Sequence, residues 1–102
     1  MIHVIAVITA KPGLREAVLR EFRAIIPKVH AEKGCIEYGP AIDAEGAESV
    51  QTKFGPDVFV VIEKWENAEA LKAHGTSPHM LELRAKTGAM LAERVIRVLA
   101  PT

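Results

Sequence analysis

The stretch VFVVIEKW, residues 58–65, decides the fold because it is the clearest β-strand in the sequence. It is rich in β-branched and aromatic residues, which favour strands. Side chains of a strand alternate between two faces. One face carries three aliphatic residues, Val58, Val60 and Ile62. The other carries Phe59, Val61, Glu63 and Trp65. Both faces are apolar over most of the strand, which predicts a sheet that is covered on both sides.

The segments before this strand predict two further strands and a helix. Residues 2–9 are a strand with apolar residues on both faces, and residues 14–34 carry the spacing of a long amphipathic helix. Pro27 lies inside that helix and is expected to kink it or to split off its last turn. Residues 35–42 predict a strand weakened by Gly39 and Pro40, and the small, polar segment 43–57 holds one candidate short strand at 50–54.

The segments after this strand predict a helical region in two pieces and a last strand. Asn67 is positioned to cap a short helix, 68–74, which Gly75 would end. Ser77 and Pro78 are a typical start for a second helix, and residues 95–99 predict the final strand. The order is β-α-β-β-α-β, which predicts an α+β, ferredoxin-like fold over residues 1–102 as one domain.

The apolar strands also predict a homodimer. Helices cover only one face of such a sheet, and a face left to solvent normally alternates apolar with polar residues. The second faces of residues 2–9 and 58–65 do not alternate in this way. The same face of a second copy is an economical cover, and closer wrapping by residues 43–57 is the alternative.

Composition excludes several classes of function. The 13 basic and 13 acidic residues cancel, so no net field attracts nucleic acid or an anionic membrane. No stretch is long and apolar enough for a membrane span. The single cysteine, Cys35, permits no internal disulfide and suits a reducing compartment, so we expect a cytoplasmic protein.

Three ionisable residues and one tryptophan are the first candidates for a site. His74 and His79 flank the helix break, which places both imidazoles at one corner of the fold. Glu63 is a carboxylate on an apolar strand face, where it needs a partner such as a histidine, tyrosine or arginine. Trp65 lies beside it. Each has a structural alternative, namely a helix-end contact for His74, a solvated residue for His79, a strand-end rim position for Glu63 and a plain core position for Trp65.

The remaining candidates would form the wall of a pocket. Tyr38 either donates a hydrogen bond to a ligand or packs in the core, and Phe59, Val61 and Met80 are apolar wall residues. The two histidines lack the HExxH spacing and show no third ligand, so no metal site is predicted. No phosphate loop, dinucleotide fingerprint or serine nucleophile motif is present, so no cofactor is predicted.

Four stretches of the sequence resemble those of a known protein family. KPG at 11–13, AEKGC at 31–35, VVIEKWEN at 60–67 and LKAHGTSPHM at 71–80 are similar to the antibiotic biosynthesis monooxygenase superfamily, nearest to its quinol monooxygenase branch. The resemblance spans nearly the whole chain, including SVQTKFGPD at 49–57. Its combined Glu-x-Trp and His-x₄-His pattern does not identify one substrate.

The resemblance implies a dimeric α/β barrel. It also implies oxidation of quinols or aromatic phenols by dioxygen, with no metal or bound flavin. Haem-degrading relatives use an asparagine, a tryptophan and a histidine where this sequence has Ala6, His74 and Arg84. Haem cleavage is therefore not expected.

These features lead to one main hypothesis and two alternatives. His74 or His79 would act as the base that removes a phenolic proton, and Glu63 would orient or stabilise the charge of that histidine. The alternatives are a small-molecule binding module without turnover, and an isomerase of a small carbonyl compound that uses the same histidines.

Overall fold

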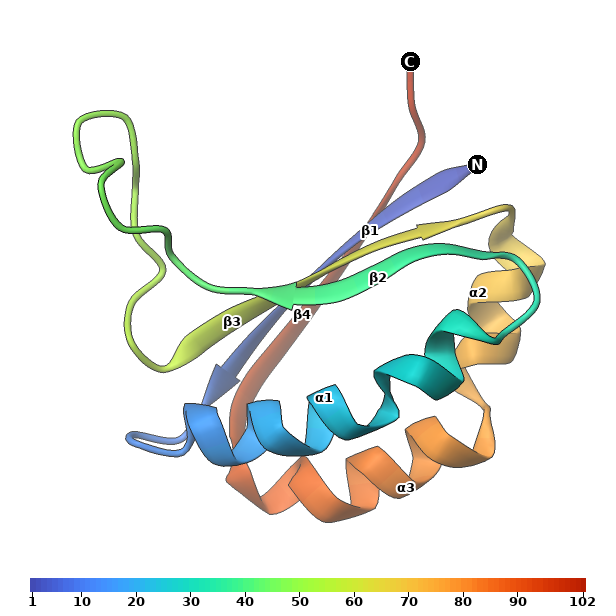
Figure 1. The fold of residues 1–102 in the computed structure, drawn as a ribbon, viewed down its shortest axis with the longest axis horizontal. Coiled ribbons are helices and arrows are strands. Elements are labelled where there is room, and N and C mark those ends of the chain that lie inside the picture. The colour runs from blue at the N-terminus through green and yellow to red at the C-terminus, as the bar shows by residue number, and fades with distance from the viewer.

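The computed structural model describes residues 1–102 as a four-stranded antiparallel sheet with helices on one face (Figure 1). The strands are β1 (Ile2–Ala10), β2 (Cys35–Ala41), β3 (Val58–Trp65) and β4 (Leu91–Leu99). Their order across the sheet is β2-β3-β1-β4. The helices are α1 (Arg15–His30), α2 (Ala68–Gly75) and α3 (Pro78–Thr87), and a short 3₁₀ turn, Gly88–Met90, leads into β4. The predicted ferredoxin-like fold is confirmed.

The core lies between the sheet and the helices. Every second residue of β1, from Val4 to Ala10, is buried, and so are Phe59 and Val61 of β3. Val18, Leu19 and Phe22 of α1 and Leu83 of α3 pack against this face. The burial alternates along β1 and β3 as strand geometry requires, so one face of each strand belongs to the core.

The expected strand at 50–54 is wrong, and of the two effects expected of Pro27 the split of the last turn does not occur. Residues 50–54 form no strand, and Val50 is 87% exposed, because no neighbouring strand is available to pair with them. No turn splits off at Pro27, since α1 continues through it to His30 and ends short of Gly34. Pro27 is exposed and removes only one hydrogen bond close to the end of the helix.

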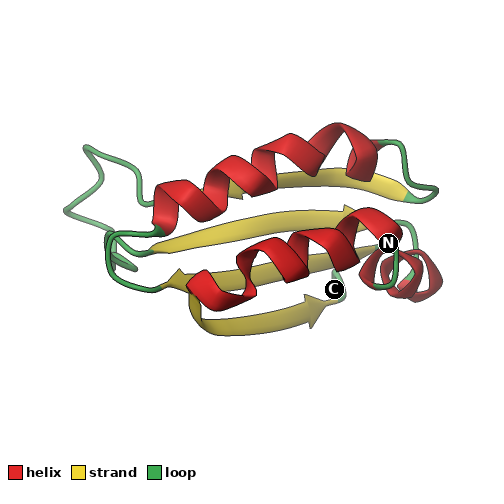
Figure 2. Ribbon diagram, turned by 90° about the horizontal axis from the view of Figure 1, so that it is seen from below, coloured by secondary structure: helices red, strands yellow, loops and turns green.

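The helices do not reach across the whole sheet. Figure 2 shows α1 and α3 in front of the sheet, with the strand that leads to the C-terminus lying outside them. Most of β4 is exposed, including Ile96 and Val98, which share a face with the buried residues of β1. The cavity described below opens beside this uncovered strand. None of the helices has the length and apolar character needed to cross a membrane.

The opposite face of the sheet carries no helix. It presents Ile5 and Val7 of β1 and Val58 and Val60 of β3, all only partly buried, and Ile62, which is 40% exposed. We call these five residues the outer face. The loop after β2 extends away from the end of the sheet (Figure 1), and loop residues such as Phe54 border a shallow pocket with Val60 and Ile62 of the outer face.

Gly34 makes the tight turn between α1 and β2. Its φ is +85°, and a Cβ atom there would lie 2.6 Å from the Cβ of Ala70. We expect Gly34→Ala to lower the free energy of unfolding by about 2–3 kcal/mol, because backbone strain and the clash add together. Chemical denaturation measures this loss. Gly46→Ala is the matched control, since Gly46 has φ +84° and no atom within 4 Å. Equal losses in the two variants would contradict the clash.

Candidate active site

The break between α2 and α3 places two histidines side by side. Asn67 caps α2 through a hydrogen bond from the Ala70 N–H, and Ser77 caps α3 by accepting from the Met80 N–H. The predicted caps are therefore confirmed. His74 lies in the last turn of α2, and His79 lies in the first turn of α3. Because α2 ends at Gly75 and Ser77 already caps α3, the chain turns sharply here and presents both rings at one corner.

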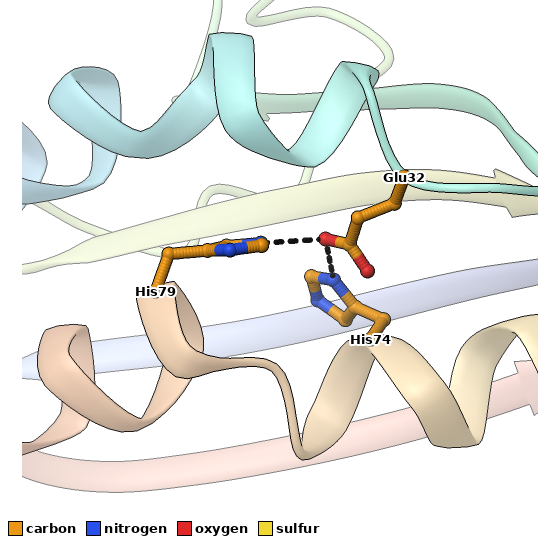
Figure 3. Close-up of side chains that lie close together, drawn as sticks. All are labelled: Glu32, His74 and His79. Carbon is orange, nitrogen blue, oxygen red and sulfur yellow. Dashed lines mark hydrogen bonds and ion pairs between the residues drawn. The ribbon is translucent and has the colours of Figure 1, made fainter.

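Glu32 joins the two histidines, although no pattern in the sequence marked it as a site residue. One carboxylate oxygen, Oε2, lies 2.8 Å from His74 Nδ1 and 2.8 Å from His79 Nε2 (Figure 3). The side chains of Glu32, His74 and His79 are 13%, 6% and 14% exposed. Glu32 comes from the turn between α1 and β2, so the site joins segments that are 42 and 47 residues apart in the sequence. The motif AEKGC contained Glu32, but nothing local indicated its partners.

This arrangement fixes the tautomer of His74. A carboxylate only accepts hydrogen bonds, so the ring nitrogens that face Glu32 carry the hydrogens. His74 then donates from Nδ1, and its Nε2 keeps a free lone pair on the side of the ring turned away from Glu32 (Figure 3). Burial lowers the pKa of His74 below its ordinary value, although the bond to Glu32 acts in the opposite direction. The ring is therefore neutral near pH 7 and available as a base.

His74 lines a cavity of about 230 Å³ between the sheet and the helices. Nine of the fourteen lining residues are hydrophobic, and they include Val4, Ala6 and Ile8 of β1. The other five are Glu63, His74, Gly75, Arg84 and Arg94, and Tyr38, counted among the nine, adds a phenolic hydroxyl. Pockets for drug-sized ligands are about 300–1,000 Å³, so this cavity suits a molecule of one or two rings.

Five of the predicted site residues line this cavity and three do not. The lining residues are Tyr38, Val61, Glu63, His74 and Met80. Phe59 is fully buried and packs edge-on against Phe22, with ring centroids 5.2 Å apart. Trp65 is fully buried and lies behind His74, with ring centroids 4.7 Å apart. His79 reaches Glu32 rather than the cavity.

Glu63 is bound to Trp65 rather than to a histidine. The indole Nε1–H donates to Glu63 Oε1 over 2.9 Å, and Glu63 is only 6% exposed, so it is not a rim residue. Burial raises the pKa of Glu63 to about 7, and the nearby Glu32 charge adds to this, while the bond from Trp65 opposes it. Glu63 is thus a carboxyl group that exchanges a proton near neutral pH. The carboxylate that orients His74 is Glu32.

The raised pKa of Glu63 predicts a pH-dependent stability. The unfolded chain loses this proton near pH 4.5, whereas the folded protein holds it until about pH 7. Stability from Glu63 is therefore complete below pH 4.5 and is lost as the pH rises towards 7. We expect Glu63→Gln to gain about 3 kcal/mol relative to the parent protein between pH 4.5 and pH 8, as measured by chemical denaturation. A constant difference across this range would contradict the buried, titrating carboxyl.

Tyr38 supplies a phenol to the same cavity. Burial and the charges of Glu63 and Glu32 raise the pKa of Tyr38, so its hydroxyl stays protonated. Its ring lies 5.3 Å from the His74 ring, centroid to centroid. The backbone carbonyl of Tyr38 bonds His30 Nε2 over 2.9 Å, which anchors β2 to the end of α1. Tyr38 is therefore a protonated phenol in the cavity lining, with its ring close to the ring of His74.

Glu32, His74 and His79 also form a set of metal-ligand types, with donor atoms within 4.8 Å of one another. Their two 2.8 Å separations are hydrogen-bond distances. Two ligands of a tetrahedral zinc ion, each about 2.0–2.1 Å from the metal, stand roughly 3.3 Å apart. An ion would have to push the carboxylate back and displace both ring protons. The present geometry therefore fits a hydrogen-bonded relay better than a metal centre.

Comparison with known proteins agrees with this fold. Residues 1–86 match the family described as Antibiotic biosynthesis monooxygenase. The chain is 40% identical to the "Probable quinol monooxygenase YgiN" of Escherichia coli, over 99% of this chain and 98% of that protein. It is 34% identical to the "Putative monooxygenase Rv0793" of Mycobacterium tuberculosis, over 98% and 90% of the two chains.

A solved structure, PA3566 from Pseudomonas aeruginosa, superposes with a TM-score of 0.81 at 32% identity. The match covers 99% of this chain and 93% of that one. The sequence and the fold therefore agree along the whole chain. This protein belongs to the antibiotic biosynthesis monooxygenase family.

Proposed function

We propose that this protein oxidises a quinol or a related aromatic phenol with dioxygen, without a metal or a bound flavin. One observation carries the proposal. A neutral imidazole, His74, borders a small apolar cavity and is held there by a buried carboxylate, Glu32. The relative named as a probable quinol monooxygenase, which matches almost end to end, supports the same class of substrate.

The first step is removal of a phenolic proton. A phenol has a pKa of about 10, close to that of tyrosine, so its anion is scarce in water at pH 7. His74 Nε2 accepts the proton as a general base, and the positive charge that forms on the ring is stabilised by Glu32. The apolar walls exclude water from the bound ring. The resulting quinolate is a far better electron donor than the neutral quinol.

The quinolate then reacts with dioxygen, which enters as a substrate. In a balanced monooxygenation, one oxygen atom is bonded to ring carbon and the other leaves as water, so a quinol plus O₂ gives a hydroxyquinone plus H₂O. The substrate loses four electrons, and both oxygen atoms gain two each. Tyr38 donates a hydrogen bond to a substrate oxygen, and Glu63, with its pKa of about 7, returns a proton to the departing oxygen.

Oxygen consumption tests this function and separates it from its two alternatives. We expect steady oxygen uptake with menadiol, above the rate of spontaneous oxidation, and incorporation of one atom from ¹⁸O₂ into the product. A binding module would protect the quinol and consume no oxygen. An isomerase would transform a small carbonyl compound equally well under nitrogen. Hydrogen peroxide as the sole oxygen product would contradict the monooxygenase step and leave a simple quinol oxidase.

We also propose that the protein works as a homodimer that pairs the outer faces of two sheets. The outer face, defined above by Ile5, Val7, Val58, Val60 and Ile62, is apolar, and no helix of the chain covers it. Burying it against itself around a twofold axis removes this surface from water.

Sedimentation equilibrium tests the dimer. We expect about twice the chain mass of 11.1 kDa for the parent protein. Val60→Asp is expected to raise the dimer dissociation constant at least about tenfold, because each copy would bury an unpaired charge in the apolar interface. Leu81→Asp is the control, since Leu81 is 55% exposed on α3, in the helix layer. A parent protein that sediments as a single chain would refute this assembly.

A further inference from the structure

Two arginines line the cavity and have no acidic partner. Arg84 comes from α3 and is half-buried, and Arg94 comes from the uncovered strand β4 and is exposed. The ion pairs of this protein that involve arginine use Arg15 and Arg23, both on α1. The function proposed above needs one base and apolar walls, and it leaves both of these cations unexplained.

The two ends of the cavity differ in charge and in depth. The end of the cavity that offers hydrogen bonds is buried in the protein, since its residues Tyr38, Glu63 and His74 are buried. Arg94 faces the same side of the sheet as Ile96 and Ile8, where no helix covers β4 (Figure 2). Arg84 stands nearer the deep end, because its guanidinium would lie 3.9 Å from a Cβ placed on Gly75, next to His74. The two positive charges therefore lie at different depths, with Arg94 at the open side of the cavity and Arg84 closer to His74.

An unpaired guanidinium against apolar walls is energetically unfavourable in the free protein. The same guanidinium favours the binding of an anionic ligand. Partial burial costs the cation some hydration, and a carboxylate restores that loss through charge-assisted hydrogen bonds. The planar fork of an arginine matches a carboxylate in two parallel bonds. Arg84 on helix α3 and Arg94 on strand β4 border the same cavity from different elements.

We propose that the substrate is an acidic hydroquinone, with a phenolic hydroxyl at His74 and a carboxylate held by Arg84 and Arg94. This inference rests on the proposed function for the orientation of the ring, and it adds the chemical class of the substituent. A neutral quinol of the same size fills the apolar part of the cavity but leaves both guanidinium groups unpaired. The arginines thus act in specificity rather than in proton transfer.

A pair of matched probes tests the charge requirement. 2,5-Dihydroxybenzoate and 2,5-dihydroxybenzamide are hydroquinones of nearly the same shape, and only the first carries a negative charge. Isothermal calorimetry under nitrogen measures binding without oxidation. We expect the benzoate to bind the parent protein at least about tenfold more tightly than the benzamide, with an advantage that shrinks as salt is added.

Substitutions locate the charge effect. Arg84→Gln is expected to weaken benzoate binding about tenfold, and the exposed Arg94→Gln about threefold, with little change for the benzamide. Arg97→Gln is the matched control, because Arg97 lies on the same strand as Arg94 but pairs with Ile5 and so faces the opposite side of the sheet. Circular dichroism of each variant verifies the fold.

The outcomes distinguish this inference from the function on which it rests. Equal affinities for the two probes, or equal losses in Arg84→Gln and Arg97→Gln, would overturn the acidic substrate and leave quinol oxidation intact if menadiol still drives oxygen uptake. Failure of both probes to bind, together with no oxygen uptake, would overturn both proposals. Preference for the benzoate that vanishes in the Arg84→Gln, Arg94→Gln double variant supports the inference.

Discussion

Replacing His74 by alanine is expected to lower kcat for quinol oxidation about 10²–10⁴-fold, which is the usual contribution of a positioned general base. The phenolic proton then has no acceptor in the apolar cavity, whereas the cavity still binds the ring, so KM changes little. Oxygen electrode assays with menadiol measure both parameters. External imidazole is expected to restore part of the lost rate in this variant, because it can occupy the space left by the side chain.

Two further variants guard this interpretation against a folding defect. His74 is 5% exposed and packs on Trp65, so His74→Gln, which keeps most of the volume, is the second test of the same role. His3→Ala is the matched control, because His3 lies on β1 with its side chain on the opposite side of the sheet from the buried Val4. Full activity in a folded His74→Gln protein would refute His74 as the base.

Replacing Glu32 by glutamine is expected to lower kcat about 10²–10³-fold, although Glu32 does not line the cavity. An amide in place of the carboxylate that orients a catalytic histidine costs up to about 10⁴-fold in serine proteases, because the wrong tautomer forms and the charged ring loses its partner. Glutamine at this position cannot accept from both rings and carry the same charge. Glu32 is therefore a positioning residue.

The pH profile distinguishes positioning from a loss of structure. The bond to Glu32 raises the pKa of His74 against the stronger effect of burial, so its removal lowers that pKa further. The acidic limb of the kcat profile, where His74 becomes protonated, is expected to move to lower pH in Glu32→Gln. Glu69→Gln on α2 is the control, since Glu69 is exposed and contacts neither histidine. An acidic limb that stays in place would argue against the Glu32–His74 coupling.

The parts of the fold that depend on local sequence patterns could be predicted from the sequence. Alternation in residues 58–65 and the capping residues Asn67 and Ser77 each act over a few positions, and the structure has the strand and both helix starts where these predict them. The candidate strand at 50–54 had suitable residues but no partner strand, and hydrogen bonds to a neighbour are what make a strand.

The site was only partly accessible, because its contacts are distant in sequence. The helix break correctly placed His74 and His79 at one corner, but their shared acceptor, Glu32, sits in a turn with no periodic pattern. Arg94 reaches the cavity only because the pairing of β4 with β1 puts it opposite Ile8, beyond the helix layer. Trp65 is screened from the cavity by His74, an outcome that strand alternation alone does not determine.

The contact between Trp65 and His74 makes Trp65 an intrinsic fluorescence reporter of this site. Trp65 is the only tryptophan in the chain, and its indole lies against the imidazole that we propose as the base. A protonated imidazole in van der Waals contact quenches indole emission far more strongly than a neutral one. Intrinsic fluorescence therefore responds to the charge on His74, and comparison with Glu63→Gln separates this response from that of the Glu63 carboxyl, which accepts a hydrogen bond from the same indole.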